Sequence, residues 1–448
     1  MAQHPARHVI IVGGGASGTL LARHLLKQPA GAIRVTLIER RAEVGKGVAY
    51  DTTNAKHIVN VRASNMSAFQ NDPGHFLRWM SSSGIAEQLP CPDPFCFVPR
   101  SVYGHYLENL VEPLLSDSNG PAPLRIIKGE CVSVRREPPR MRAVMADGSV
   151  QEGDIVVLAT GNEFCASGIS DVSTPSSGRS LAQSADDTVL LIGTGLTMVD
   201  HVLTLLQQGH KGSIVAISRR GLLPQPHRPV QAMEINRSDI PFGESVSRIL
   251  RWLRAFVRHG HDWRAVIDAL RPYMQEMWQS LSALEKRRFL QHARPWWDIH
   301  RHRMAPEVEH QIKVLIADGQ LTIIAGKIDA IDEADDVKKV RFRRRHQQRQ
   351  ETMRIRTVVE CRGLNNSLEN TNNIVLRDLE RAGLAISDEL NIGLKVAKDN
   401  ALVSASGVAC DDLFAVGPLT RGTFWEVVAI PDIRIQCERL AKHILERP

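Results

Sequence analysis

Apolar and polar positions follow one another along the chain in blocks that predict a strand, a turn and a helix. The first block has an apolar run at 9–12, a glycine-rich turn at 13–18 and apolar residues at three- and four-residue spacing up to residue 26. A second apolar run, 33–38, ends in Glu39. Short continuous apolar runs are typical of buried strands, and the wider spacing is typical of a helix. The pattern therefore predicts a β-α-β unit at the start of the chain.

The same pattern begins again near the middle of the sequence. An apolar run at 188–192 leads into the turn Gly193-Thr194-Gly195, a helical pattern and a second strand at 214–217. Further on, the segment 321–331 matches the segment 124–134 at its leucine, both isoleucines and its glycine. Two copies of one architecture are present, so we predict an α/β fold with two Rossmann-like dinucleotide-binding domains.

A helical insertion interrupts the second copy. Between about 228 and 317, apolar residues recur at three- and four-residue intervals, and five of the seven tryptophans lie there. Tryptophan with arginine can mark single-strand nucleic-acid binding, but at helical spacing it is more typical of a packed core. We predict that the first domain comprises 1–185 and 356–448, and that the second comprises 186–355 with the insertion.

The glycines of the first turn have the spacing of a dinucleotide site. In Gly13-x-Gly15-x-x-Gly18 the first glycine permits the turn, the second lets a pyrophosphate approach the backbone, and the third lets the helix pack on the strand. Free N–H groups at the helix start would hold the phosphates. Glu39 lies 21 residues beyond Gly18, about where a carboxylate bonds a ribose hydroxyl pair.

The second turn differs from the first in two ways. Met198 replaces the third glycine, and Ser218-Arg219-Arg220 stands where the first copy has its acid. A carboxylate selects a free 2′-hydroxyl, whereas arginine beside serine accommodates a 2′-phosphate. The second site is therefore predicted to prefer NADPH, with NADH as the alternative. Its predicted ligands are Gly193, Gly195, Leu196, Thr197, Ser218, Arg219 and Arg220.

Composition narrows the choice of partners. With 43% hydrophobic and 23% charged residues the chain is typical of a soluble globular protein, and its net charge of +7 suits anionic small molecules. The charge is spread along the sequence, so we expect no nucleic-acid partner. No apolar run reaches the roughly 18 residues of a membrane span and no signal peptide is evident, so we expect no membrane partner.

The cysteines bear on the compartment and on redox chemistry. Seven cysteines, scattered and odd in number, are typical of a reducing environment, so we expect a cytoplasmic protein. Cys91 and Cys96 resemble the redox pair of flavin disulfide reductases in their spacing. Because Pro92 and Pro94 disfavour the helix that such a pair opens, we interpret the two cysteines as unpaired thiols in a loop.

Two polar stretches supply candidates for chemistry. The excursion at 40–79 leaves the end of the second strand, at the edge where ligands of α/β sheets bind. The segment 296–304 carries Asp298 and two histidines, but Arg301 and Arg303 interleave with them and would repel a cation, so we expect no metal. The candidates for orienting substrate or moving protons are Arg62, His75, Asp298, His300 and Glu426. A structural ion pair or helix cap is the alternative for each.

The combined motifs resemble a known group of proteins. They are GGGASG at 13–18, GKGVAY at 45–50, HIVNVRASNMSA at 57–68, DPGHFLRW at 72–79, FVPRSVYGHYL at 97–107, IGTGLTMVD at 192–200, SRRG at 218–221, DIHRHRMAPEV at 298–308 and VGPLTRGTFWEVVAIPDIR at 416–434. The chain resembles two-dinucleotide-domain flavoproteins. More narrowly, it is similar to a bacterial family of FAD/NAD(P)-binding proteins related to flavin-dependent N-hydroxylating and Baeyer–Villiger monooxygenases.

This resemblance implies FAD on the first motif, NAD(P)H on the second, and a flavin between 60–66 and 417–425. The residues it assigns to FAD are Gly13, Gly15, Ala16, Ser17, Gly18, Glu39, Arg40, Gly47, Tyr50, Asn60, Val61, Met66, Val132, Thr160, Gly161, Gly417 and Trp425. Two positions depart from the family pattern. Arg362 stands where a smaller residue is usual, and Pro418 replaces an acid that often follows the last glycine in flavin reductases.

The implied function is an NAD(P)H-consuming monooxygenase. A dry pocket that protects a hydroperoxyflavin would let it oxidise a small nitrogen-containing substrate of the amine or hydroxylamine type. The expected partners are this substrate and dioxygen, and a homodimer is the assembly considered. Two alternatives stand beside it. One is a reductase or dehydrogenase that passes electrons to another acceptor, and the other is a non-enzymatic protein that senses flavin or NADPH and binds a partner.

Overall fold

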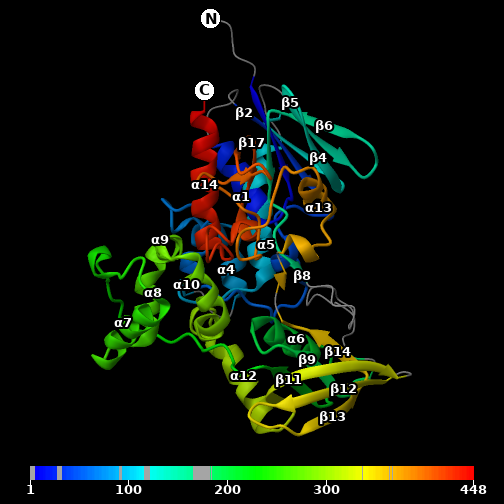
Figure 1. Ribbon diagram of the computed structural model, residues 1–448, viewed down its shortest axis with the longest axis vertical. Helices are drawn as coiled ribbons and strands as arrows, with labels where there is room; N and C mark the ends of the chain where they lie inside the picture. The colour runs from blue at the N-terminus through cyan, green and yellow to red at the C-terminus, as the bar shows by residue number, and fades with distance from the viewer. Residues whose placement is uncertain are drawn as a thin grey trace, which may run out of the picture. The chain divides into compact units, whose positions relative to one another are not determined.

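The computed structural model divides the chain into two compact units. It describes residues 6–27, 33–89, 93–115, 122–164, 182, 184–334, 337–362, 364–365 and 367–447. The first unit comprises 1–51, 61–163 and 365–448, and the second comprises 52–60 and 164–364. Each unit has a sheet of its own (Figure 1).

A six-stranded sheet forms the centre of the first unit. Its strands are β1 (Arg7–Val12), β2 (Ile33–Glu39), β3 (Leu124–Lys128), β7 (Ile155–Leu158), β16 (Ala401–Val403) and β17 (Ala409–Ala415). In the order β16-β17-β7-β1-β2-β3, every neighbouring pair is parallel except β16 with β17. β7 is buried along its whole length, as expected of a parallel strand that is covered on both faces.

Helices and a small antiparallel sheet complete the first unit. The helices are α1 (Ala16–Leu25), α2 (Gly47–Tyr50), α3 (His75–Ser82), α4 (Ile85–Gln88), α5 (Arg100–Val111), α13 (Ile374–Arg381) and α14 (Ile430–Glu446), with the single turns η1 (Ala63–Asn65), η2 (Glu112–Leu114), η6 (Leu368–Asn370) and η7 (Gly417–Thr420). The small sheet is β4 (Cys131–Glu137), β5 (Arg140–Met145) and β6 (Val150–Gly153). α1 packs against α14 and α5, which places the helix that follows the first turn inside the unit.

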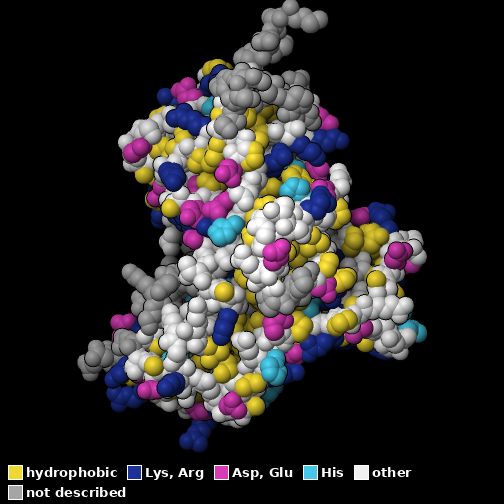
Figure 2. Space-filling model, turned by 180° about the vertical axis from the view of Figure 1, so that it is seen from behind, with side chains coloured by type: hydrophobic (Ala, Val, Ile, Leu, Met, Phe, Trp, Pro, Cys, Tyr) yellow, Lys and Arg dark blue, Asp and Glu magenta, His cyan; other side chains and the backbone are white. Residues whose placement is uncertain are grey.

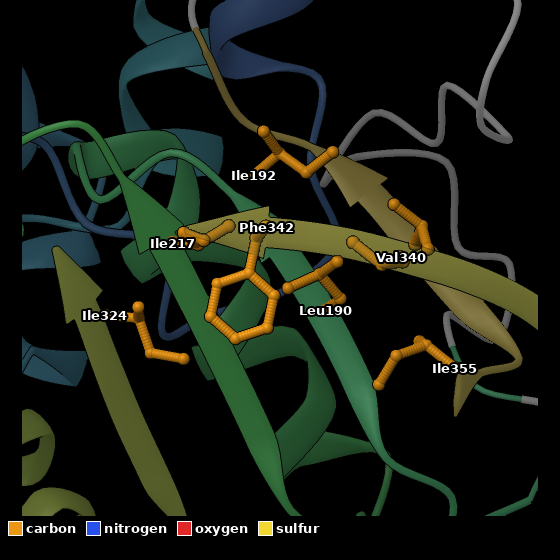
Figure 3. Packing of buried hydrophobic residues seen from close by; sticks show 8 residues of the cluster. Leu190, Ile192, Ile217, Ile324, Val340, Phe342 and Ile355 are labelled. Carbon is orange, nitrogen blue, oxygen red and sulfur yellow. The ribbon is translucent and has the colours of Figure 1, made fainter. Parts of the chain in front are cut away.

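The second unit repeats this plan with a mixed sheet. Its strands are β9 (Val189–Ile192), β10 (Ile214–Ser218), β11 (Leu321–Ala334), β12 (Val337–Arg344), β13 (Gln350–Ile355) and β14 (Thr357–Glu360). The strand order is β13-β12-β11-β10-β9-β14. The neighbouring strands β11, β10, β9 and β14 are parallel, and β12 and β13 extend the sheet as an antiparallel ribbon. Aliphatic residues from all six strands and Phe342 form its core (Figure 3).

The insertion in the second unit is helical. After α6 (Leu196–Gln207), which follows β9, come α7 (Val246–Arg258), α8 (Trp263–Leu270), α9 (Met274–Ser280), α10 (Ala283–Arg288), α11 (Arg294–Arg301) and α12 (Pro306–Ala317), with η3 (Arg237–Asp239), η4 (Arg271–Tyr273) and the π-helical turn η5 (Phe289–Ala293). α12 leads directly into β11. Among the described residues, no helix combines the length and apolar character that crossing a bilayer requires.

The predicted fold class is confirmed, and the boundaries between the units differ from the predicted ones. Residues 356–364 lie in the second unit because β14 pairs with β9 in parallel register. Residues 52–60 also lie there, because the buried His57 side chain contacts the Asp200 carbonyl and the Thr204 hydroxyl of α6. The two-residue strands β8 (Glu163–Phe164) and β15 (Leu364–Asn365) form a separate small sheet.

Basic and acidic side chains are interspersed on the face seen in Figure 2.

Candidate cofactor sites

The first glycine turn connects β1 to α1 in a backbone conformation that excludes side chains. Gly13 has φ of +106°, and a Cβ atom there would lie 2.5 Å from the Ala159 carbonyl oxygen. Its N–H donates to the Ile38 carbonyl at 2.9 Å. A Cβ atom on Gly18 would lie 2.0 Å from the Gly13 carbonyl oxygen. Both glycines are therefore required by the packing of the turn itself.

Glu39, at the end of β2, braces this turn. Its side chain is only 7% exposed, one carboxylate oxygen accepts the Gly14 N–H at 2.7 Å, and the other accepts the Arg41 N–H at 2.9 Å. Each oxygen has a second lone pair, so the carboxylate can still accept from a ribose hydroxyl. The sequence pattern predicted the ribose role of Glu39 and missed the bracing role, which the position of Gly14 inside the motif could have suggested.

The start of α1 is suited to an anion. Its first turn contains no acidic residue, and its N-cap residue, Gly15, has no side chain that could cap the helix. The loop before α2 lies against it, because the Gly45 N–H donates to the Gly14 carbonyl at 2.7 Å and a Cβ on Gly15 would lie 3.4 Å from the Gly47 Cα. Unpaired N–H groups and the helix dipole at such a start favour phosphate.

The turn after β7 has room and an unsatisfied hydroxyl. Gly161 has φ of +73°, and a Cβ there would meet no atom of the described residues within 4 Å. Within the described part of the chain, the buried hydroxyl oxygen of Thr160 has no hydrogen-bond partner. A buried hydroxyl without a partner is costly, and a bound polar group would satisfy it. Together with the α1 N-terminus, these residues fit a dinucleotide such as FAD.

The C-terminal segment of the first unit also packs on α1. Gly417 has φ of +73°, and a Cβ there would lie 2.5 Å from the Ser17 hydroxyl oxygen. Its N–H donates to the buried Gln436 side chain at 2.7 Å. Next along the chain, Trp425 is 1% exposed, and Glu426 is a buried carboxylate with φ of +73°, a backbone conformation that is strained for a residue other than glycine.

The remaining residues assigned to FAD are spread over several elements. Val61 and Met66 are buried in the segment around η1, and Val132 is partly buried on β4. Arg40 is exposed and pairs with Glu130 at 3.1 Å. The ring centroids of Tyr50 and Tyr103 lie 4.9 Å apart, and burial raises the pKa of the Tyr50 phenol. Asn60 belongs to the second unit, where its carbonyl accepts from His227 at 3.1 Å.

The second glycine turn, between β9 and α6, repeats the geometry of the first. Gly193 has φ of +119°, its N–H donates to the Ile217 carbonyl at 2.8 Å, and a Cβ there would lie 2.4 Å from the Cys361 carbonyl oxygen. A Cβ on Gly195 would meet no atom of the described residues within 4 Å. α6 begins at Leu196 without an acidic residue in its first turn, so its start is also suited to an anion.

The strand end beside the second turn carries two unpaired cations. Arg219 is exposed and Arg220 is partly buried, and neither forms a hydrogen bond or ion pair with the described residues. Ser218, by contrast, is engaged within the protein, because its hydroxyl accepts the Gly221 N–H at 3.0 Å and lies 2.9 Å from the Thr194 hydroxyl. The guanidinium of Arg362 pairs with Glu360, so its charge is compensated.

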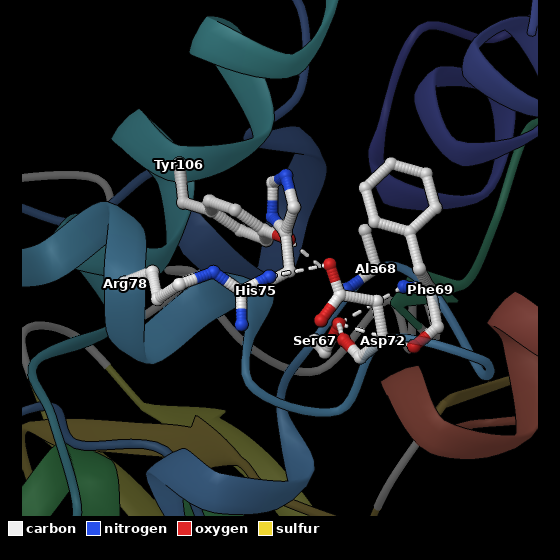
Figure 4. A network of polar contacts seen from close by, with 7 residues as sticks. All are labelled: Ser67, Ala68, Phe69, Asp72, His75, Arg78 and Tyr106. Atoms are coloured by element: carbon white, nitrogen blue, oxygen red, sulfur yellow. Dashed lines mark hydrogen bonds and ion pairs between the residues drawn. The ribbon is translucent and has the colours of Figure 1, made fainter.

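His75 lies in an aromatic cluster of the first unit. Figure 4 shows its network, which comprises Ser67, Ala68, Phe69, Asp72, His75, Arg78 and Tyr106. His75 Nδ1 lies 2.8 Å from the Tyr106 hydroxyl, its ring is 4.7 Å from that of Phe69, and burial lowers its pKa. Phe69 in turn contacts His24 near the C-terminal end of α1, the opposite end from Gly15. The structure therefore places His75 away from the glycine turn.

The other candidates for catalysis also have protein partners. Arg62 lies over the Phe95 ring at 5.4 Å. In the second unit, the Arg294 guanidinium pairs with Asp298 at 3.2 Å, and His300 Nδ1 lies 2.7 Å from the Trp296 carbonyl oxygen. These two are in α11, whose buried neighbour Arg303 pairs with Asp268. Among the described residues, no group of three or more potential metal ligands comes together.

Comparison with known proteins adds to this geometry. Residues 10–163, which include the first turn, Glu39 and the turn after β7, match the model of a family described as FAD-NAD(P)-binding. This segment is therefore similar to the FAD-NAD(P)-binding domains of that family. No curated protein sequence matches the chain.

Solved structures extend the likeness over the whole fold. Ornithine N-hydroxylase of Kutzneria sp. 744, with reduced FAD, NADP⁺ and L-ornithine, is 16% identical with a TM-score of 0.68, over 98% of this chain and 99% of that one. L-lysine 6-monooxygenase of Pseudomonas syringae is 15% identical with a TM-score of 0.67 over the same shares. The FAD-bound cadaverine monooxygenase of Erwinia amylovora is 15% identical with a TM-score of 0.62, over 99% and 95%. The chain has their two-dinucleotide-domain fold.

Proposed function

We propose that the first unit binds FAD and the second binds NADPH. The contrast between the two strand ends supports this assignment. Glu39 favours a ribose with free hydroxyls, and the unpaired Arg219 and Arg220 favour a 2′-phosphate. In the first unit the FAD phosphates would lie at the start of α1, with Thr160 and Gly161 beside the cofactor.

We further propose that the chain is an NADPH-consuming monooxygenase that oxidises a small amine or hydroxylamine. The names of three structures with the same fold support this class, because each is a hydroxylase or monooxygenase of ornithine, lysine or cadaverine. The start of α1 and the turn after β7 would hold FAD, which would supply the redox chemistry between NADPH and dioxygen. The chain itself would bind, orient and shield the reactants.

The contacts of the candidate residues divide them into two groups. We propose Glu426 and Arg62 for substrate or proton handling, because they belong to the unit with the FAD turn and Glu426 is a buried carboxylate in a strained backbone. For His75, Asp298 and His300 we propose structural roles. Each of these three side chains makes contacts that account for its position.

The state of the cysteines argues against disulfide reduction. Among the described residues, Cys96, Cys131, Cys361, Cys410 and Cys437 are buried free thiols. Burial raises the pKa of Cys131 to about 12 and also raises that of Cys361, so neither is activated as a thiolate. Cys91, the partner considered for Cys96, lies outside the described residues.

The reaction class is tested by measuring how NADPH oxidation is coupled to oxygenation. NADPH consumption and hydrogen peroxide release are followed on the FAD-loaded protein with ornithine, lysine, cadaverine, hydroxylamine, thioethers and ketones. An amine or hydroxylamine is expected to speed NADPH oxidation and suppress peroxide. Peroxide release equal to NADPH consumption with every compound would remove the support for a monooxygenase.

The cofactor assignment is tested with a matched pair of charge variants. Arg219→Gln with Arg220→Gln is expected to raise the KM for NADPH by about 100-fold or more and to leave bound FAD unchanged, because two charge-assisted hydrogen bonds together contribute about 3 kcal/mol or more. Arg345→Gln with Arg349→Gln removes the same charge from two exposed arginines of the second unit and serves as the control. Equal effects of the two pairs would show that only net charge matters.

A further inference from the structure

Three hydrogen bonds and the Gly221–Leu222 backbone form a closed ring that joins the second glycine turn to the loop after β10. It contains Ser218, Gly221, Leu222 and Thr194. The Gly221 N–H donates to the Ser218 hydroxyl at 3.0 Å, the two hydroxyls lie 2.9 Å apart, and the Thr194 hydroxyl donates to the Leu222 carbonyl at 2.6 Å. Thr194 is the residue between Gly193 and Gly195, so the ring starts inside the turn.

The direction of each bond in the ring follows from the groups involved. A carbonyl oxygen only accepts, so the single hydroxyl proton of Thr194 is used toward Leu222. Between the two hydroxyls, Ser218 must then be the donor and Thr194 the acceptor. Because Ser218 has no second proton, it cannot donate to a bound phosphate while the ring is intact.

These hydrogen bonds give Ser218 a role that differs from the predicted one. The sequence assigned it to the 2′-phosphate together with two arginines, whereas its hydroxyl is used to anchor the loop. Arg219 and Arg220 are the two residues between the anchored positions Ser218 and Gly221. Gly221 has φ of +61°, and a Cβ on it would lie 3.1 Å from Ala325, so this end of the loop is also tightly fixed.

We propose that Thr194 is a positioning residue for recognition of the 2′-phosphate. By holding Ser218 and the Leu222 carbonyl, its hydroxyl fixes the short loop that carries Arg219 and Arg220. A fixed loop loses less conformational entropy when the arginines bind an anion. The selectivity for NADPH over NADH therefore depends on a threonine inside the pyrophosphate turn. This inference rests on the proposed binding of NADPH in the second unit.

The test compares two nucleotides that differ only in the 2′-phosphate. Dissociation constants of adenosine 2′,5′-bisphosphate and adenosine 5′-monophosphate are measured by calorimetry on the FAD-loaded full chain. Thr194→Val keeps the shape and removes the hydroxyl. It is expected to weaken bisphosphate binding about tenfold and to leave monophosphate binding unchanged, since a lost internal hydrogen bond is worth roughly that factor. Thr194→Ser retains a hydroxyl and is expected to stay within about twofold of the parent.

A second variant tests whether the effect belongs to the ring. Ser218→Ala is expected to give the same loss of selectivity as Thr194→Val, and the double variant no more than either alone, because all three break one ring. Additive losses would overturn the ring, and a Thr194→Val variant that weakens both nucleotides equally or neither would overturn the positioning role. A parent protein that binds both nucleotides equally would instead refute the proposed NADPH site.

Discussion

The two glycine turns have the same backbone path and different side-chain bracing. In both, the first glycine has a positive φ, donates to a carbonyl near the end of the second strand and faces the carbonyl that directly follows a neighbouring parallel strand, β7 or β14. In both, the next residue is tied to the end of that second strand. The first turn uses a carboxylate on a backbone N–H, Glu39 to Gly14, and the second uses a hydroxyl pair, Thr194 with Ser218. The same backbone turn is therefore braced at the same position by a carboxylate in one unit and by a hydroxyl pair in the other.

The turns also differ in how closely they are enclosed. A Cβ on Gly15 would lie 3.4 Å from the Gly47 Cα, whereas a Cβ on Gly195 would meet no atom within 4 Å in the part of the chain that the structure describes. Gly18 has no room for a side chain, whereas Met198, its counterpart, is fully buried in the second unit. An enclosed turn suits a cofactor that stays bound, and an open turn suits a coenzyme that exchanges, in agreement with the proposed assignment.

The largest loss of stability is expected from substitutions at the third glycine position of the turns, which is Gly18 in the first turn and Met198 in the second. Gly18→Ala forces a methyl carbon into the Gly13 carbonyl, a backbone atom that cannot move away, and is expected to lower the free energy of unfolding by about 4 kcal/mol or more and to abolish FAD retention. Met198→Ala removes a buried side chain and is expected to lower it by about 2–3 kcal/mol. Urea unfolding and FAD content are measured for both. A larger loss for Met198→Ala would contradict the difference in packing.

The next largest difference in stability is expected between the side chains that brace the two turns, Glu39 in the first and Ser218 in the second. Glu39→Gln turns an N–H donor toward the Gly14 or Arg41 N–H and removes the charge, so we expect a loss of about 2–3 kcal/mol in the free energy of unfolding together with loss of FAD. Ser218→Ala removes neutral hydrogen bonds and is expected to lower it by about 1 kcal/mol, with FAD retained. The same unfolding curves, read beside FAD absorbance, give both values. Equal losses would mean that the carboxylate contributes no more than a hydroxyl.

The turns and the two-copy architecture could be predicted from the sequence because they depend on local spacing, whereas the contact of Glu39 with Gly14 was missed. Glycine positions relative to an apolar run decide whether a tight turn and a close helix can form. The direction of the Ser218 hydroxyl could not be predicted, because its partner is Thr194, 24 residues earlier, and becomes a neighbour only when β9 pairs with β10.

The sequence also could not predict which segments pack in the other unit from their neighbours in the chain. Residues 52–60 follow the first β-α-β unit in the chain but pack on α6 of the second, through the contacts of His57. The catalytic reading of His75 rested on its residue type within a polar excursion. Its hydrogen-bond partner Tyr106 comes from α5 and becomes a neighbour only in the fold, whereas Phe69 lies in the same polar excursion.

The helices after the two turns each carry a buried histidine, which gives a pH-dependent comparison. Burial lowers the pKa of His24 in α1 and of His201 in α6 to about 4. The unfolded chain takes up these protons near pH 6.5 and the folded chain does not, so stability falls as pH decreases from 6.5 toward 4. At pH 5 each histidine is expected to lower the free energy of unfolding by about 2 kcal/mol relative to its value at pH 7.

His201 allows the cleaner test of this acid sensitivity. It is 1% exposed, and neither ring nitrogen has a partner among the described residues, so His201→Phe removes the titration without breaking a hydrogen bond. The variant is expected to lose less stability than the parent between pH 7 and pH 5, measured by tryptophan fluorescence in urea. His310→Gln, at an exposed position of α12, is the control and should keep the parent slope. An unchanged slope for His201→Phe would exclude His201 as a source of acid sensitivity.

The smallest change in stability is expected at Gly195, where the two turns differ most in openness. Gly195→Ala adds a methyl group that meets no atom within 4 Å at a negative φ, so the free energy of unfolding should stay within about 0.5 kcal/mol of the parent. The same methyl group would lie on the backbone that the pyrophosphate approaches, so NADPH affinity should fall while FAD content is unchanged. Thermal unfolding and NADPH titration separate the two effects. A loss of stability would mean that the open space at Gly195 is filled by protein, whereas unchanged affinity would place the pyrophosphate elsewhere.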